Sequence, residues 1–175
     1  MHANGRLTSE DIHISTQPWE QVEVDAFVCP INSEGTMTEY PASKLQDLVG
    51  LPLEPFLKGH TPLAIGAALV TQAGRMRARC LIHVPNTATS GGRVQVEEVL
   101  RATSAALVAC TVRQIRSVAV PLMGAFDTGI LAEEAARAIL SQYRAHRGEF
   151  PSTVYLMASN ADEYDVFETA YENTT

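Results

Sequence analysis

The chain has 175 residues and a formal net charge of -7, with 13 lysine and arginine residues against 20 aspartate and glutamate residues. Because duplex-binding proteins neutralise phosphates with a basic surface, this balance argues against duplex nucleic acid as the partner. No apolar run is long enough to span a bilayer, and the polar N-terminus lacks the apolar core of a signal peptide, so we expect a cytoplasmic protein without membrane attachment.

The length fits one domain, and no repeat or long Pro/Gly/Ser linker divides it, so we expect a single unit over residues 1–175. The cysteines, Cys29, Cys80 and Cys110, make no Cys-x-x-Cys pair and no Cys/His cluster. We therefore expect neither disulfide bonds nor a bound metal, and no motif calls for a cofactor. The excess of arginine over lysine and the alanine-rich helices are typical of a bacterial protein.

Apolar runs and alternating patterns predict strands at residues 12–14, 22–30, 66–71, 81–84, 118–122 and 154–158. Helical spacing predicts helices at residues 42–49 and about 94–112, one beginning near residue 131, and a terminal helix. Asn160 and Glu163 have the spacing of a capping box at the start of that last helix. The passage that contains Pro52, Pro55 and Pro62 is expected to be irregular.

Strands and helices alternate along most of the chain. This order predicts an α/β fold in which helices cover both faces of a largely parallel sheet. In such sheets, ligands bind at the carboxyl ends of the strands, so the loops that follow the strands are the places to look for a site.

Residues 117–138, SVAVPLMGAFDTGILAEEAARA, are the most informative stretch. A buried strand ends in a loop bounded by Gly124 and Gly129, and the helix that follows directs its first N–H groups and positive dipole end at that loop. This is an arrangement that holds phosphates. Asp127, however, places a carboxylate in the middle of the loop. From its position in the loop it could, like Thr128, cap the helix that follows.

Three segments carry recognisable motifs: VDAFVCPIN at residues 24–32, PLAIGAALVTQAGRMRARCLIHV at residues 62–84, and PLMGAFDTGILAEEAA at residues 121–136. The last two are specific as a pair. Through them the chain, from about residue 12 to residue 170, resembles the macro domain, a family known for binding ADP-ribose and related nucleotides. The resemblance implies a three-layer α/β/α sandwich with a mixed, mostly parallel central sheet.

The resemblance also implies a crevice between two loops, with backbone N–H groups holding the diphosphate and the distal ribose lying between the loops. Asn32 matches the family position that faces the distal ribose, and Asn32 and Asp127 are the candidate catalytic residues. Asp127 would act as a general base or ribose-hydroxyl acceptor unless it serves as a helix cap. From its own context, Asn32 is equally a turn-capping residue after Pro30. The second loop supplies the remaining binding residues, expected to be Gly124, Ala125, Phe126, Thr128 and Gly129.

Several positions depart from the family pattern. Where the family has an Asp that accepts a hydrogen bond from the adenine amino group, this chain has no carboxylate, and Thr16 or Gln17 would have to accept instead. The first phosphate loop lacks the usual glycine run. It has Gly35 with Glu34 and Glu39 nearby, so we do not expect it to form the usual phosphate cradle.

Other side chains have two interpretations each. Trp19 and Phe126 are expected near the mouth of the crevice, where each either stacks on a base, covers the core edge or serves as an interface anchor. His83 is expected to be a hydrogen-bonded core residue. Some macro-domain hydrolases pass through a lysine–sugar adduct, but here Lys44 and Lys58 are the lysines available and neither matches that motif.

The sequence thus supports two main hypotheses of different kinds, beside a weaker third one, a hydrolase that acts on a different small substrate. The first is a macro-domain-like protein that binds ADP-ribose or a related nucleotide in a modified crevice, with weak hydrolysis of ADP-ribose derivatives included. The alternative is a non-catalytic scaffold or regulatory module that has kept the fold, has lost the ligand and acts through protein contacts.

Overall fold

The computed structural model describes residues 11–89, 91–124 and 129–173. Its elements, in chain order, are β1 (Ile12–Ser15), the 3-10 turn η1 (Trp19–Gln21), β2 (Ala26–Asn32), α1 (Ala42–Val49), α2 (Glu54–Lys58), β3 (Leu69–Gln72), β4 (Cys80–Thr87), α3 (Val96–Arg113), β5 (Ser117–Pro121), α4 (Ala132–Ala145), β6 (Thr153–Met157) and α5 (Ala161–Asn173). Within these ranges, none of the helices combines the length and the apolar character that crossing a membrane requires.

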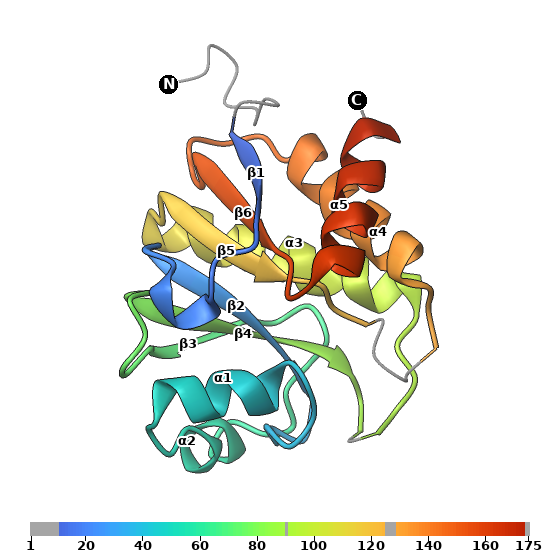
Figure 1. Ribbon diagram of the computed structural model, residues 1–175. Helices are drawn as coiled ribbons and strands as arrows, with labels where there is room; N and C mark the ends of the chain where they lie inside the picture. The colour runs from blue at the N-terminus through green and yellow to red at the C-terminus, as the bar shows by residue number, and fades with distance from the viewer. Residues whose placement is uncertain (1–10, 90, 125–128, 174–175) are drawn as a thin grey trace.

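The strands form one mixed sheet in the order β1-β6-β5-β2-β4-β3. β3 is antiparallel to β4, and the other neighbouring strands are parallel. Helices α1 and α2 lie on one face of the sheet, and α3, α4 and α5 lie on the other (Figure 1). The predicted three-layer α/β/α architecture with a mixed, mostly parallel sheet is therefore confirmed.

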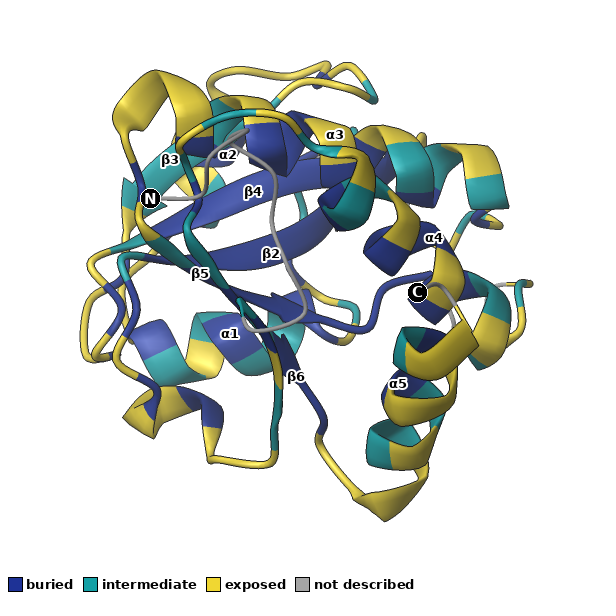
Figure 2. Cartoon of the chain, turned by 90° about the horizontal axis from the view of Figure 1, so that it is seen from above, coloured by how far each residue is buried: buried dark blue, intermediate teal, exposed yellow. Residues whose placement is uncertain are grey.

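Each face of the sheet has its own apolar core. In β2, Ala26 and Val28 belong to the core beneath α3, α4 and α5, whereas Phe27, Cys29 and Ile31 belong to the core on the side of α1. Successive side chains of a strand point to opposite faces, so a strand covered on both sides needs a continuous apolar run. The central strands are accordingly buried along their length (Figure 2).

Some boundaries differ from the sequence-based expectation. β2 and β3 begin later, at Ala26 and Leu69, where their regular pairing with β4 begins. The proline-rich passage contains α2, whose first turn holds Pro55, where a missing N–H costs no intrahelical hydrogen bond. β4 continues to Thr87 because it pairs with β2 as far as Asn32.

Asn160 caps the start of the last helix as predicted, but Glu163 reaches back to Ser159 and not to Asn160, so the full capping box does not form. The Glu163 N–H donates to Asn160 Oδ1 at 2.9 Å, and the Glu163 carboxylate accepts the Ser159 N–H at 3.2 Å. These two bonds satisfy backbone donors that have no partner inside the helix. They also fix where α5 begins relative to the carboxyl end of β6.

His83 lies in the core, as expected. It is fully buried in β4, and its Nε2 lies 2.7 Å from Thr71 Oγ1. Its Nδ1 has no hydrogen-bond partner among the described residues. Burial disfavours the charged imidazolium and lowers the pKa of His83 to about 4.

This burial predicts a loss of stability between about pH 6.5 and about pH 4. In that window the unfolded chain binds a proton at His83 that the native chain does not, so acid favours unfolding by about 3 kcal/mol in total. Below about pH 4 both states are protonated and the loss stops growing. Urea unfolding across this window checks the slope.

Two variants separate this effect from general acid sensitivity. His83→Gln should flatten the pH dependence, whereas His13→Gln, at an exposed position of β1, should keep the wild-type slope. An unchanged slope in His83→Gln would contradict the assignment.

Candidate functional site

A hollow of about 460 Å³ lies at the carboxyl ends of β2, β4 and β5. This is the edge at which α/β sheets bind ligands. Its described walls contain one acidic and no basic side chain. The residues that line it are Pro30, Ile31, Asn32, Thr36, Glu39, Tyr40, Pro41, Ala42, Asn86, Thr87, Gly91, Gly92, Val94 and Gly124.

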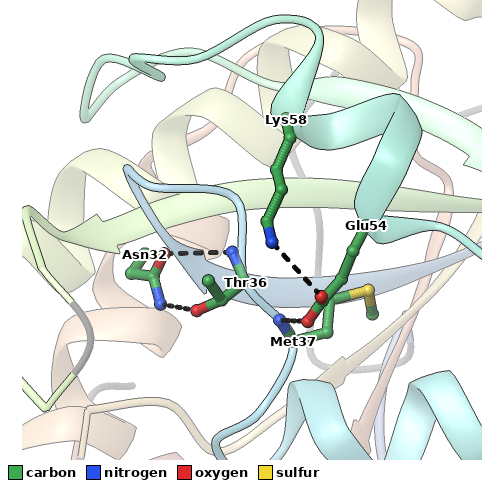
Figure 3. Close-up of polar contacts among 5 residues, drawn as sticks. All are labelled: Asn32, Thr36, Met37, Glu54 and Lys58. Carbon is green, nitrogen blue, oxygen red and sulfur yellow. Dashed lines mark hydrogen bonds and ion pairs between the residues drawn. The ribbon is translucent and has the colours of Figure 1, made fainter.

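Asn32, the last residue of β2, is 3% exposed and caps the turn that follows it. Its Nδ2 donates to Thr36 Oγ1 at 2.5 Å, and its Oδ1 accepts the Thr36 N–H at 3.2 Å (Figure 3). The turn-capping interpretation is therefore correct. A side-chain amide has two N–H donors and two acceptor lone pairs, so these bonds leave capacity for a molecule in the hollow.

The loop after β2 uses its backbone N–H groups inside the protein. The N–H of Ser33 donates to Thr87 O at 2.8 Å, and that of Gly35 donates to Asn32 O at 3.2 Å. The N–H of Thr36 donates to Asn32 Oδ1 at 3.2 Å, and that of Met37 donates to Glu54 Oε1 at 2.6 Å. Glu54 comes from α2 and also lies 3.8 Å from Lys58 Nζ (Figure 3). Because these amides already have acceptors, they form no ready cradle for a phosphate, which agrees with the expectation from the missing glycines.

Glu39 brings a carboxylate into the hollow. Its Oε1 accepts the N–H of Gly91, which lies in the loop between β4 and α3. The bond joins the two loops that border the hollow. An amide that could meet an anion is therefore occupied by the protein's own carboxylate, whose charge opposes a second anion nearby. Glu34, in the same loop, is exposed and is not among the lining residues.

The loop after β5 enters the hollow at Gly124. This residue has a φ of 86°, and a Cβ built on it would lie 2.8 Å from Val99 Cγ2, so both conformation and space favour glycine. At the other end of the loop, Gly129 lies beside Arg93: a Cβ on Gly129 would be 3.8 Å from Arg93 Nε. A cation thus lies next to the loop predicted to meet phosphates.

The centre of that loop was predicted to supply several site residues, among them the candidate catalytic Asp127. Ala125, Phe126, Asp127 and Thr128 lie outside the described residues. The helix α4 that follows has Leu131 at its N-cap, and that residue makes no side-chain capping bond.

Lys44 and Lys58 have partners away from the hollow. Lys44 Nζ lies 3.9 Å from the centroid of the Trp19 ring, and Lys58 pairs with Glu54. Neither lysine is among the residues that line the hollow. The geometry therefore offers no support for a mechanism through a lysine–sugar adduct.

The interpretation of Trp19 as a residue that stacks on a base is wrong. Trp19 is 2% exposed, and its ring packs on Phe27 and Tyr40 with centroids 5.3 and 5.9 Å apart. It starts η1, which folds onto the core beside α1, so the core-edge interpretation holds. Because Tyr40 lines the hollow, Trp19 supports the wall of the hollow from behind.

A second hollow, of about 420 Å³, lies at the carboxyl ends of β1 and β6. Thr16 lines it, whereas the Gln17 side chain donates to Gln21 O at 3.4 Å. The Tyr40 hydroxyl lies 2.9 Å from Ser159 Oγ, so a residue that lines the first hollow contacts one that lines the second. The remaining lining residues are Ala158, Ser159, Asn160, Ala161, Tyr164 and Asp165.

Several lining residues were missed from sequence. Asn86 and Thr87 are nearly buried polar residues at the carboxyl end of β4. Their position directly after the apolar run LIHV was the signal that could have found them, since ligands collect at that edge of the sheet. Tyr40 and Asp165 had no such signal, because each reaches its hollow through the packing of a loop or helix.

The fold is that of an α/β domain, and its candidate site lies at the carboxyl edge of the sheet. The family model described as "Macro domain" matches residues 29–139. An uncharacterized protein of Aeropyrum pernix is 31% identical over 144 residues, which covers 82% of this chain and 76% of that protein.

Two solved structures share the fold at low identity. The Oceanobacillus iheyensis macrodomain with ADP superposes with a TM-score of 0.79 at 15% identity, covering 92% of this chain and 90% of that one. The Trypanosoma brucei macrodomain in complex with ADP-ribose gives 0.76 at 17% identity, covering 91% and 68%. With the family match, these findings show that the chain belongs to the macro domain family.

Proposed function

We propose that this protein binds ADP-ribose or a related nucleotide-derived ligand along the carboxyl edge of its sheet. The proposal depends on one observation: Asn32, buried at the end of β2, lines the same hollow as Gly124. Gly124 lies where the loop after β5 begins. The macrodomains of Trypanosoma brucei and Oceanobacillus iheyensis, which share the fold, were crystallised with ADP-ribose and ADP.

The two hollows suit the two ends of such a ligand. We place the distal ribose beside Asn32 in the first hollow and the base in the second, where Tyr164 offers a ring and Thr16 a hydroxyl. Asp165, which also lines the second hollow, offers a carboxylate to an adenine amino group in place of the aspartate that the family carries after the first strand. The hydroxyl pair of Tyr40 and Ser159 lies between the two ends.

The diphosphate would then rely on the loop between Gly124 and Gly129 and on Arg93. The loop after β2 contributes little, because its amides donate within the protein. Glu39 and Asp127 add negative charge. We therefore expect binding in the micromolar range, weaker than a site with two free amide loops would give.

Weak hydrolysis of ADP-ribose derivatives is the accompanying chemical proposal. Water would add to the anomeric carbon of the distal ribose, Asp127 would accept a proton from that water, and the bond to the leaving group would break as the leaving group takes up a proton. Asn32 would orient the ribose. Turnover of an ADP-ribosylated protein that persists in both Asn32→Ala and Asp127→Ala would overturn this assignment.

Two observations favour the alternative of a scaffold without a ligand. The internally bonded loop amides and the Glu39 carboxylate both disfavour an anion in the first hollow. Calorimetric titration with ADP-ribose separates the two functions: micromolar binding supports the ligand site, whereas no heat up to millimolar concentration supports the scaffold.

If ADP-ribose binds, Asn32→Ala is expected to weaken it roughly tenfold, since a buried polar contact of this kind contributes about 1–1.5 kcal/mol. Asn173→Ala, at the far end of α5, is the matched control and should bind as the wild type does. Thermal unfolding of each variant checks that loss of the turn cap has not unfolded the chain. Unchanged affinity in a folded Asn32→Ala variant would remove this residue from the site.

A further inference from the structure

The edge of the sheet at β3 carries apolar side chains that the fold leaves uncovered. β3 is the outermost strand, and in the described chain it pairs with β4 alone (Figure 1). Around it, Phe56 of α2 is 46% exposed, and Val108 and Val112 of α3 are 59% and 76% exposed. An edge strand presents backbone donors and acceptors to a further strand. This surface therefore combines the two features that strand addition uses, a free strand edge and pockets for apolar side chains.

Two hollows of about 590 Å³ each flank β3, and they share Phe56, Val70 and Arg113. One continues along α3 past Val108, and the other continues past Leu51, on the side of α1 and α2. The first hollow borders residues 65–70 and the second borders residues 70–72, so the two hollows follow one another along the β3 edge. Because a strand rises about 3.3 Å per residue, one extended segment that runs beside β3 passes both hollows.

The charge around these hollows selects the partner. Arg101 and Arg113 line the hollow along α3, Arg79 and Arg113 line the other, and the described lining residues include no aspartate or glutamate. Arg79 lies 3.7 Å from Asp25, so part of its charge is already met. In a chain with a net charge of -7, a rim of this sign is complementary to carboxylates on the partner.

A second copy of this chain is a poor occupant. A two-fold interface places the same patch on both sides, so two β3 edges would bring their arginines face to face. We propose that the β3 edge surface, formed by β3, Phe56, Val108, Val112, Arg101 and Arg113, binds an extended protein segment in which apolar and acidic residues alternate. This proposal does not depend on ADP-ribose binding.

Fluorescence anisotropy with a labelled peptide, Asp-Val-Glu-Val-Asp-Val-Glu, tests the proposal on the full chain. We expect a Kd of roughly 10–100 µM that rises with salt, as charge complementarity requires. Val112→Glu and Arg113→Glu should each weaken binding roughly tenfold or more. Leu131→Glu, which changes an equally exposed apolar residue away from this surface, should leave it unchanged.

Four results would overturn the proposal. The first is no binding of the acidic peptide at about 1 mM. The second is equal affinity for a peptide with lysine in place of the acidic residues, and the third is equal affinity of Val112→Glu and the wild type for the acidic peptide. The fourth is a dimer, seen in sedimentation, that Val112→Glu dissociates. The last result would assign the surface to a second copy of the chain. Hydrogen exchange that slows at β3 when the acidic peptide binds would support strand addition directly.

Discussion

Trp19→Ala is expected to lower the free energy of unfolding by about 3–5 kcal/mol, because truncation of a buried aromatic residue leaves a cavity. The indole is 2% exposed and contacts Phe27, Tyr40 and Lys44. The loss should also reach the site, since Tyr40 lines the first hollow and would lose the ring that supports it. Urea unfolding followed by circular dichroism measures the change, because the variant lacks the chain's single tryptophan as a fluorescent probe.

Trp19→Phe is the matched variant. It keeps an aromatic ring and removes the indole Nε1, which has no hydrogen-bond partner among the described residues. We expect it to cost less than about 1.5 kcal/mol and to preserve ligand binding. If Trp19→Phe lowers the free energy of unfolding as much as Trp19→Ala does, aromatic packing is not what Trp19 contributes to stability.

Glu39→Gln is expected to strengthen ADP-ribose binding. A carboxylate about 4 Å from a phosphate opposes it by about 1 kcal/mol in water and about 4 kcal/mol in a partly buried site, so affinity should rise about tenfold or more. Glutamine retains the side-chain oxygen that accepts the Gly91 N–H, so the loop contact persists while the charge is lost. Asp127→Gly is expected to act in the same direction. Calorimetric titration gives both affinities.

Glu34→Gln is the control for Glu39→Gln, because it removes the same charge from the same loop at an exposed position that does not line the hollow. Its affinity should stay near the wild-type value. Adenosine, which carries no phosphate, should bind wild type and Glu39→Gln equally. A higher affinity of Glu39→Gln than of the wild type for adenosine would argue against charge repulsion inside the hollow. So would equal gains in ADP-ribose affinity in Glu34→Gln and Glu39→Gln.

The sequence could not distinguish the positions of Glu34 and Glu39 relative to the hollow. Both were recognised as carboxylates beside the first phosphate loop, and the loop was correctly predicted to be a poor phosphate cradle. Only the structure shows that Glu39 lines the hollow, while Glu34 points to solvent. The loop amides were not predicted to be occupied, because one of their acceptors, Glu54, lies in a helix that the prolines had concealed.

The alternation of strands and helices, the largely parallel sheet, the capped start of α5 and the burial of His83 were readable from the chain, because periodicity, capping and strand composition are local properties. The mixed character of the sheet was expected only from the resemblance to the family. What only packing decided is which distant groups meet. Trp19 folds inward against Phe27, Tyr40 reaches Ser159, and Phe56 and Val112 remain uncovered beside β3. These contacts and exposures depend on how distant loops and helices pack on the sheet, and no local sequence pattern determines that packing.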